Sequence, residues 1–355
     1  MKWNKRIIIS VILLIMTVGF SILKLQETVF IRTHYNSESV RLRSEGVTRK
    51  DLDNALKNEK ANSSSDIPDV TAWVRLNEEE IYNYDLNRKV QVPIVQVAGD
   101  MNETEPMSLK YGNYVYEKDS KGCIIDEDTA YSLFGTYDAT GNILTYKGSD
   151  YFIRGVVKAT YPMFMIPGNN AAKYNNLELI YSNKEFGEKS AEEFLLQNSI
   201  AANYVIVDGY FYGRLIYSLL NLPIWMFYIL FFILLLKYFW KKRHSENKRS
   251  FAIYCGIGTL GMIGYGGILY ETIGNPLYFP LKLIPTKFSD FDYWSNEYHV
   301  MMDQFKKMQY LLPNPKDLYL ENELVKLSLN VTVMLLLYLA FFICIRSSVR
   351  KNERA

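Results

Sequence analysis

The fold of this chain is read most directly from the stretch GCIIDEDTAYSLFG, residues 122–135. Its first part, Gly122–Asp126, is rich in apolar and β-branched residues and predicts a strand. Its second part, Glu127–Phe134, predicts a short helix that stops at Gly135, because glycine readily takes the left-handed conformation in which helices end. A strand that runs directly into a helix indicates a domain in which both kinds of element pack together.

Further elements are expected on both sides of this stretch. Downstream, Ile143–Tyr146 and Tyr151–Val157 flank Lys147-Gly148-Ser149-Asp150, which predicts a hairpin with a glycine in its turn. Upstream, Val90–Val97 has the β-branched composition of a strand, and Pro93 within it indicates an edge strand or a bulge. The remaining expected elements are a helix that starts at a Thr48 cap, strands at Val70–Leu76, Leu177–Tyr181 and Tyr204–Val207, and a helix at Ser190–Gln197. The sequence therefore predicts a mixed α+β domain.

The same stretch contains three consecutive acids, Asp126, Glu127 and Asp128. Neighbouring carboxylates are compatible with a site for a divalent cation. At the start of a short helix, however, carboxylates also stabilise the positive end of the helix dipole. We expect this second, structural role.

The overall composition indicates a membrane protein. Of the 355 residues, 49% are hydrophobic and 22% are charged. The net charge of +2 excludes a strongly basic nucleic-acid-binding protein, and a disulfide framework is excluded because only three cysteines are present, Cys123, Cys255 and Cys344. Four segments approach the length of about 20 apolar residues that a membrane-spanning helix needs. They are Ile7–Leu23, Leu215–Trp240, Phe251–Tyr270 and Leu327–Ile345.

The distribution of positive charge predicts the topology. Lys and Arg residues cluster before the first segment, between the second and third, and after the fourth, which places these parts in the cytoplasm. The outer part then carries a net charge of about −9. The expected organisation is a cytoplasmic N-terminus and first span (1–23), an extracytoplasmic domain (24–214), a second span (215–240), a cytoplasmic loop (241–250), a third span (251–270), an extracytoplasmic loop (271–326), a fourth span (327–345) and a cytoplasmic tail (346–355).

Two features of this topology need comment. The first span begins as a cleaved signal peptide does, but no small-x-small cleavage site follows it, so we expect an uncleaved anchor. The loop at 271–326 is rich in proline and aromatic residues. Aromatic side chains need a surface to bury against, so we expect this loop to pack as a cap.

No motif of a known kind of active site occurs in the sequence. The phosphate-binding pattern GxxxxGK[ST] is absent, as are HExxH and GxSxG. The three histidines, His34, His244 and His299, are distant in sequence, so we do not expect them to share a metal. We therefore predict no catalytic residue, no metal site and no bound cofactor on this chain.

The predicted third span carries glycines at every third position, Gly258, Gly261, Gly264 and Gly267. Glycines at this spacing form a ridge on which another helix can approach closely. We expect helix packing at this ridge, and the pattern leaves open whether the partner helix belongs to the same chain or to another copy.

Three segments of the outer domain together resemble a known family. They are residues 122–135, Thr140-Gly-Asn-Ile-Leu144, and Tyr151-Phe-Ile-Arg-Gly-Val-Val157. They are similar to the extracytoplasmic core domain of MacB-like ABC transporter permeases (also called FtsX-like), in which a helix ending A-x-x-L-F-G is followed by G-x-x-L and a closing strand. The matching positions are Ala130, Leu133, Phe134, Gly135, Gly141, Leu144, Gly155, Val156 and Val157. Upstream, Val95–Gly99 resembles the family's strand before its variable loop. The resemblance also covers the layout of one span, a large outer domain and three further spans.

The resemblance further implies a cytoplasmic element that contacts a separate ATPase. Residues 248–259 are similar to that element, with matches at Ala252, Ile253, Gly258 and Thr259. The family's acidic residue near the start of the element is replaced by Ser250. If Phe251–Thr259 forms the contact, the third span moves to Leu260–Leu281 and includes Glu271; the register Phe251–Tyr270 is favoured because it contains no charge. The expected ATPase contacts are Arg243, Lys248, Arg249 and Phe251.

These observations predict the permease subunit of an ABC transporter, used in export or efflux. The chain would be non-catalytic, and ATP and Mg would bind to the ATPase partner. The other expected partners are a second permease copy or a homologous permease, and membrane lipid, but no nucleic acid. The alternative is a membrane-anchored extracytoplasmic binding or sensor protein that derives from such a permease and no longer transports.

Overall fold

The computed structural model describes residues 5–43, 46–62, 66–116, 118–200, 203–242, 248–273, 281–285, 287, 289–309 and 314–353. The chain divides into two compact units. We call Met1–Thr33, Arg214–Pro280 and Asn322–Ala355 the helical unit. We call His34–Gly213 together with Leu281–Glu321 the sheet unit.

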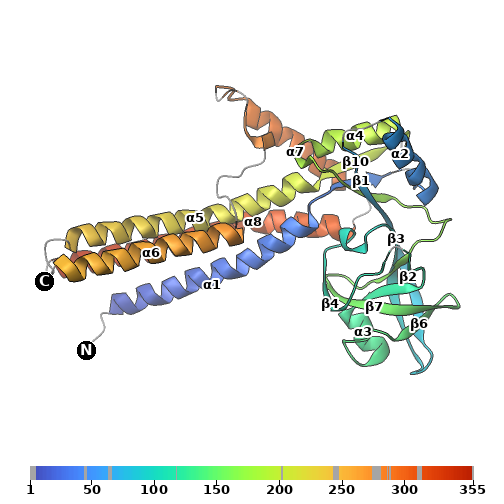
Figure 1. Cartoon of the computed structure of the whole chain (residues 1–355), viewed down its shortest axis with the longest axis horizontal. Coiled ribbons are helices and arrows are strands. Elements are labelled where there is room, and N and C mark those ends of the chain that lie inside the picture. The colour runs from blue at the N-terminus through green and yellow to red at the C-terminus, as the bar shows by residue number, and fades with distance from the viewer. Residues whose placement is uncertain are drawn as a thin grey trace. The chain divides into compact units, whose positions relative to one another are not determined.

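The sheet unit is built on one ten-stranded mixed sheet, with the strand order β10-β1-β9-β2-β3-β8-β5-β7-β4 and β6 bridging β2 and β7 (Figure 1). Neighbouring strands are antiparallel, except that β3 pairs with β8 and β5 pairs with β7 in parallel. The strands are β1 Glu38–Leu42, β2 Asp69–Asn83, β3 Arg88–Ala98, β4 Met107–Gly112, β5 Gly122–Asp126, β6 Ile143–Tyr146, β7 Ser149–Ala159, β8 Phe164–Pro167, β9 Asn176–Ile180 and β10 Tyr204–Asp208.

Short helices accompany the sheet, and long ones make up the helical unit. In the sheet unit they are α2 Arg49–Ala61, η1 Met101–Glu103, α3 Glu127–Phe134, η2 Lys184–Phe186, α4 Gly187–Gln197, η3 Leu281–Leu283 and α7 Tyr293–Gln309. The long helices are α1 Lys5–His34, α5 Gly209–Lys242, α6 Lys248–Ile273 and α8 Pro315–Glu353.

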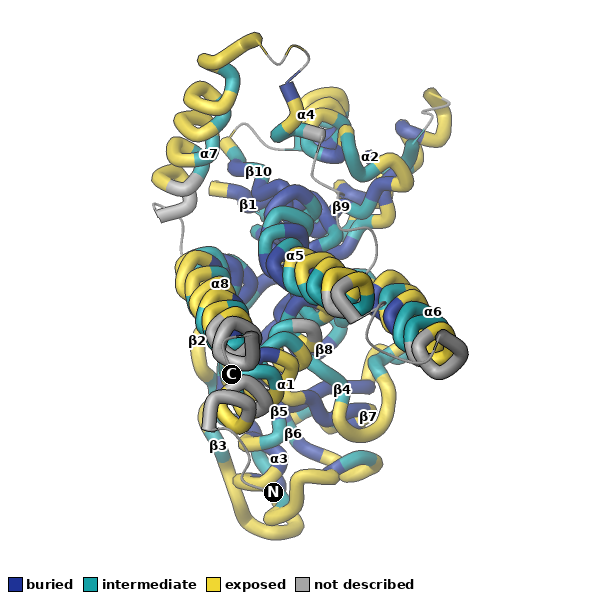
Figure 2. The backbone as a smooth tube through the Cα atoms, turned by 90° about the vertical axis from the view of Figure 1, so that its left-hand side faces the viewer, coloured by how far each residue is buried: buried dark blue, intermediate teal, exposed yellow. Residues whose placement is uncertain are grey.

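In the helical unit the axes of the long helices are nearly parallel, and the helices are seen end-on in Figure 2. Their interior contains the buried side chains of Ile224 and Trp225 on α5, Leu269 on α6, and Met334 and Tyr338 on α8. Many outward-facing apolar side chains are exposed, and a lipid bilayer would cover such a surface without cost.

Within the described residues, three helices are long and apolar enough to cross a membrane: Ile12–His34, Gly209–Lys237 and Pro315–Arg346. They overlap the predicted first, second and fourth spans. The predicted third span, Phe251–Tyr270, lies inside α6, some of whose side chains fall outside the described part. The count of four spans stays a prediction, as does the register of the third.

The elements around the stretch that opened the sequence analysis are confirmed. β5 and α3 have the predicted bounds, and the two-residue turn Lys147-Gly148 joins β6 to β7. Both turn residues have positive φ, 50° and 74°, as the twist of a tight hairpin requires. β3 is not an edge strand, because it pairs with β2 and β8; Pro93 instead lies next to an irregularity in the β2–β3 register.

The acids at the start of α3 have the predicted structural role. The Asp126 side chain caps the helix by accepting hydrogen bonds from the backbone N–H groups of Asp128 and Thr129, at 3.1 and 3.0 Å. Its other oxygen accepts from the Thr129 hydroxyl at 2.6 Å and from the Met163 N–H at 2.8 Å. Both carboxylate oxygens of Asp126 are therefore used within the fold.

Candidate functional site: a buried charge cluster at the start of the last long helix

Four charged side chains meet in the interior of the sheet unit: Arg41 on β1, Glu178 on β9, and Lys316 and Asp317 on the first turn of α8. We call them the charge cluster. The Lys316 Nζ lies 2.7 Å from the Glu178 Oε2, and the Arg41 Nη1 lies 3.0 Å from the Glu178 Oε1. Arg41 also donates through Nε and Nη2 to the two oxygens of Asp317, each at 3.0 Å. Glu178 is fully buried, Lys316 is 2% exposed and Arg41 is 3% exposed.

The carboxylate of Glu178 receives hydrogen bonds from uncharged groups as well. Ser37 and Ser39 donate their hydroxyls to Oε2 at 2.7 and 2.5 Å, and the indole N–H of Trp73 donates to Oε1 at 3.2 Å. Burial by itself would raise the pKa of Glu178, but the charges of Lys316 and Arg41 and these hydrogen bonds lower it to about 2. Glu178 is therefore ionised at every physiological pH.

Local sequence explains why α8 begins at this place. Pro315 is the first helical residue, where its missing N–H has no cost, and the Asn314 side chain accepts from the Asp317 N–H at 2.8 Å as a helix cap. Asn314 also donates to the Asn176 side chain on β9 at 3.2 Å. The Tyr35 hydroxyl donates to the Lys316 carbonyl oxygen at 2.6 Å, and burial raises the Tyr35 pKa well above its ordinary value. The start of α8 is thus fixed to the sheet by several independent contacts.

Three adjacent strands connect to α1, α5 and α8, the helices that are long and apolar enough to cross a membrane within the described residues. α1 ends at His34 and β1 begins at Glu38, while β10 ends at Asp208 and α5 begins at the next residue. β1 and β10 are neighbours in the sheet. The charge cluster attaches the start of α8 to β1 and β9. All three helices are therefore connected to one corner of the sheet, β10-β1-β9.

A second group of buried carboxylates lies at this corner. Glu38 and Asp208 are opposite each other on β1 and β10, and both are at least nine-tenths buried. Burial, together with the charge of Asp208, raises the pKa of Glu38 to about 10, and burial raises the pKa of Asp208 to about 6. Lys282 provides positive charge, with its Nζ 2.5 Å from Glu188 and 3.8 Å from Asp208. At neutral pH Glu38 is held as the uncharged acid.

The residues expected to contact an ATPase are only partly described. Arg243 lies outside the described residues. Lys248, Arg249 and Phe251 lie in the first turn of α6, and their side chains are outside the described part. Their role stays a prediction.

The glycine ridge of α6 has two kinds of environment. A Cβ on Gly258 would meet the Phe239 ring of α5 at 2.7 Å, so this glycine permits close helix contact within the chain. At Gly261, Gly264 and Gly267 an added Cβ would meet no described atom within 4 Å. Gly266, beside the ridge, lies against the Tyr228 hydroxyl. Whether a second chain packs against the three open positions stays a prediction.

The histidines and cysteines have separate places. His34 is buried in the sheet unit with its Nε2 2.7 Å from the Met107 carbonyl oxygen, His299 is exposed on α7, and His244 lies outside the described residues. Cys123 is buried in the core next to α3, which raises the pKa of its thiol. Cys255 and Cys344 are half-buried.

The charge cluster was not predicted from the sequence. Lys316 and Asp317 look like ordinary charges before an apolar helix, and Glu178 lies more than 130 residues from either partner. One signal was available. The helix-start pattern Asn314-Pro315 immediately precedes the charged pair, and the charged pair precedes a long apolar segment.

The sheet, the helices and their connections define a class of protein: a mixed α+β domain carried by apolar helices of membrane-spanning length. Residues 7–194, more than half of the chain, match the family described as MacB-like periplasmic core domain. The chain belongs to this family and is a MacB-like ABC transporter permease with an extracytoplasmic core domain.

Solved structures with similarity to the chain include two transporter domains. The extracellular domain of the ABC-type transporter YknZ from Gram-positive bacteria is 14% identical, with a TM-score of 0.36, over 48% of this chain and 98% of that domain. The periplasmic region of MacB from Actinobacillus actinomycetemcomitans is 14% identical, with a TM-score of 0.41, over 50% of this chain and 91% of that region. A search of curated protein sequences finds no match.

Proposed function

We propose that this chain is the membrane subunit of an ABC transporter that passes the motion of a separate ATPase to an extracytoplasmic domain. The observation that carries the proposal is the attachment of three long apolar helices to one corner of the sheet, β10-β1-β9. Two are attached by short or absent linkers, and the third by buried ion pairs. Mechanical coupling between a membrane helix and an outer domain requires that no long flexible linker separates the two.

The proposed topology has four spans, with both termini in the cytoplasm and the sheet unit outside. Lys and Arg cluster in the segments assigned to the cytoplasm, as the positive-inside rule requires. ATP and Mg would bind to the partner ATPase. A second copy of this chain, or a homologous permease, would complete the pair on which the ATPase dimer acts.

The first test is recovery of the tagged chain from its native membranes in a mild detergent, with bound proteins identified by mass spectrometry. An ATPase with a phosphate-binding loop, recovered in comparable amount, supports the proposal. Recovery of the chain alone, or with outer-surface proteins only, contradicts it and favours a binding or sensor protein.

The second test concerns the contact surface for the ATPase. Alanine at Arg243, Lys248, Arg249 and Phe251 together is expected to abolish recovery of the ATPase while the chain still inserts into the membrane. A matched control replaces the exposed basic residues Lys306 and Lys307 of α7, which lie in the sheet unit. Equal recovery of the ATPase with both variants would remove this segment from the proposed contact.

A further inference from the structure

A cavity in the sheet unit lies beside the charge cluster. Its volume is about 630 Å³, which is within the range of ligand-binding cavities, roughly 300–1,000 Å³. It is formed by the start of β2, the turn and η1 helix after β3, the segment after β4, and the end of β9. Four separate parts of the chain therefore contribute to one concave surface.

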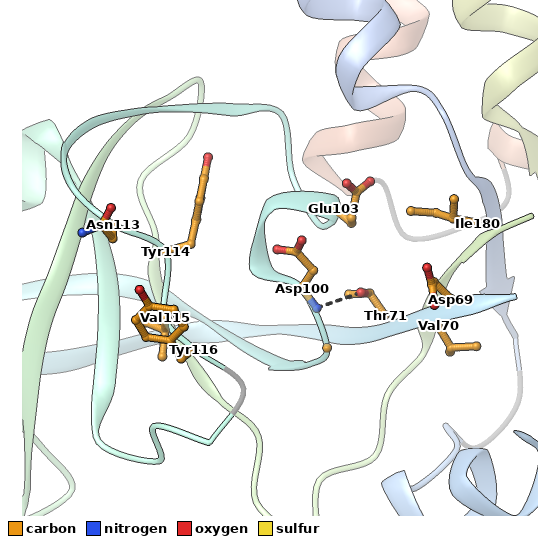
Figure 3. A pocket seen from close by; sticks show the side chains of 11 residues that line it. Asp69, Val70, Thr71, Asp100, Glu103, Asn113, Tyr114, Val115, Tyr116 and Ile180 are labelled. Carbon is orange, nitrogen blue, oxygen red and sulfur yellow. Dashed lines mark hydrogen bonds between the residues drawn. The ribbon is translucent and has the colours of Figure 1, made fainter. Parts of the chain in front are cut away.

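The lining of the cavity combines negative charge with an aromatic and apolar wall. Asp69, Asp100 and Glu103 contribute carboxylates, and no Lys, Arg or His is among the described lining residues. Figure 3 shows the Asp100 and Glu103 carboxylates pointing to the same side as the upright ring of Tyr114. Val70 and Ile180 add apolar surface. Such a lining suits a cation that is attached to an apolar or aromatic body, because aromatic rings also attract cations.

Of the lining carboxylates that receive no hydrogen bond from a described residue, Glu103 is more buried than Asp69. It is half-buried, and no described residue donates a hydrogen bond to it. Asp100, by contrast, accepts from the Asn102 N–H at 2.9 Å, and its own N–H donates to the Thr71 hydroxyl at 2.9 Å. Burial raises the pKa of Glu103, and the nearby charge of Lys316 offsets this only in part. A partly buried carboxylate without a donor gains most from a cationic ligand.

The backbone next to this carboxylate is bound to the charge cluster. The Lys316 Nζ donates to the Glu103 carbonyl oxygen at 3.0 Å, and to Glu178 at 2.7 Å. Lys316 thus has its ammonium directed at the main chain of η1 and at Glu178. A group bound at the Glu103 side chain would therefore contact the same residue whose carbonyl oxygen accepts the hydrogen bond from Lys316, at the start of α8.

We propose that this cavity binds the ammonium or guanidinium group of a cationic organic ligand, with its charge at Glu103 and Asp100 and its apolar part against Tyr114. Either a free cationic small molecule or the basic side chain of a peptide supplies this chemistry. Binding stabilises the η1 segment and therefore the Lys316 contact that fixes α8. The proposal goes beyond the transporter assignment, and its test uses no ATPase.

The test is calorimetric titration of the full chain in nanodiscs of uncharged phosphatidylcholine lipid. Benzylammonium is the cationic probe, and benzyl alcohol, similar in size and shape, is the neutral one. N-acetylarginine amide represents a peptide side chain. At least one cationic probe is expected to bind at least tenfold more tightly than benzyl alcohol, and high salt is expected to weaken that binding. The tighter of the two cations identifies the source of the ligand.

Substitutions locate the binding. Glu103→Gln keeps the shape of the side chain and removes its charge, and is expected to weaken cation binding by about tenfold. Glu127→Gln on α3, outside the cavity, is the matched control and is expected to leave binding unchanged. Asp100→Asn retains the side-chain oxygen that accepts from the Asn102 N–H. If Glu103→Gln fails to fold, cation binding is measured with this variant instead. Equal binding of benzylammonium and benzyl alcohol, no binding of either cation, or equal effects of Glu103→Gln and Glu127→Gln would overturn the proposal.

Discussion

The two ends of the ten-stranded sheet are stabilised by different forces. Around β5, α3 and the β6–β7 hairpin the core is apolar, with Leu133, Ile125 and Phe164 buried, and Asp126 is the one buried charged residue of those elements. At the corner β10-β1-β9, Glu38, Arg41, Glu178, Asp208 and Lys316 are all buried. The end around β5 resembles the interior of a small soluble domain. The corner β10-β1-β9 instead contains buried charged side chains at the place where the long helices connect to the sheet.

This difference indicates a division of roles. An apolar core tolerates small rearrangements of its side chains, whereas a buried ion pair fixes one geometry, since separating the charges leaves each of them desolvated. Fixed geometry would suit the transmission of motion from helix to sheet that we propose for this chain. The apolar end has only to stay folded. Four predictions follow from this contrast, and the largest effects come first.

The sharpest comparison uses two lysines that form ion pairs of the same length. Lys316 lies 2.7 Å from Glu178 in the interior, and Lys147 lies 2.7 Å from Glu79 at the surface. Lys316→Met is expected to lower the free energy of unfolding by about 3–5 kcal/mol, because Glu178 stays buried with one cation fewer. Lys147→Met is expected to have little effect. Thermal unfolding of the full chain in detergent, followed by circular dichroism, measures both; equal losses would contradict the contrast.

At the apolar end, the free energy of unfolding should depend on the volume of the buried side chains and not on their charge. Leu133 on α3 is fully buried, and Leu133→Ala is expected to lower the free energy of unfolding by about 3 kcal/mol through the cavity it leaves. Ser132→Ala on the exposed face of the same helix is the control. The loss should not depend on salt concentration, and a loss that disappeared in high salt would show that charge matters at this end too.

The pH dependence of stability should come from the charged corner. The raised pKa values of Asp208 and Glu38 mean that the folded state holds more protons than the unfolded state, so the free energy of unfolding falls as pH rises. For Asp208 the fall covers about pH 4 to 6 and amounts to roughly 3 kcal/mol. Glu178 has the opposite sign: its stabilising contribution is present above pH 4.5 and is lost as pH falls towards 2.

Chemical unfolding at a series of pH values, with Glu38→Gln as the test variant, measures this dependence. The variant cannot ionise at that position, so its stability should fall less than that of the unchanged chain between pH 6 and 9. The matched variant Glu127→Gln should follow the unchanged chain. A steep fall that persisted in Glu38→Gln would assign the dependence to other groups.

The smallest effect is expected at the glycine that ends α3. Gly135 has φ 74°, and a Cβ there would also approach the Arg88 guanidinium to 3.2 Å. Gly135→Ala is expected to cost about 1 kcal/mol, since only glycine takes this conformation without strain. Gly148→Asn is the control, because asparagine tolerates positive φ in a tight turn. Thermal unfolding compares the two variants. A Gly135→Ala variant as stable as the unchanged chain would contradict the prediction of strain at this position.

The contrast also explains which parts of the fold were predictable from sequence. β5, α3 and the β6–β7 hairpin follow from local rules: a capping Asp126, a stop at Gly135 and a Lys147-Gly148 turn. β1 was missed because its sequence, ESVRL, contains Glu38 and Arg41, and charges at buried positions contradict the alternation expected of a strand. Their partners come from distant parts of the chain, which no local pattern reveals.

The loop expected at 271–326 shows the same limit. The sequence indicated aromatic residues in need of burial, but it did not indicate the helix α7, Tyr293–Gln309, within that loop. Gln304 of α7 donates to Glu188 at 2.9 Å, and Tyr212 donates to Gln304 at 3.2 Å. These polar contacts join residues about 90 to 120 positions apart, so they depend on the assembled fold.

The position of β1 also has a consequence for how the protein is made. β1 is among the first strands to leave the ribosome, yet its neighbours β9 and β10 follow more than 130 residues later, and Asp317, which pairs with Arg41, comes 276 residues after it. Until α8 has been synthesised, Arg41 and Glu178 have no complete set of partners. The corner that joins the helices to the sheet is therefore completed only after the start of α8 has been made. A nascent chain that ended before α8 would leave the charges of Arg41 and Glu178 without Asp317 and Lys316, in a form that chaperones and proteases recognise.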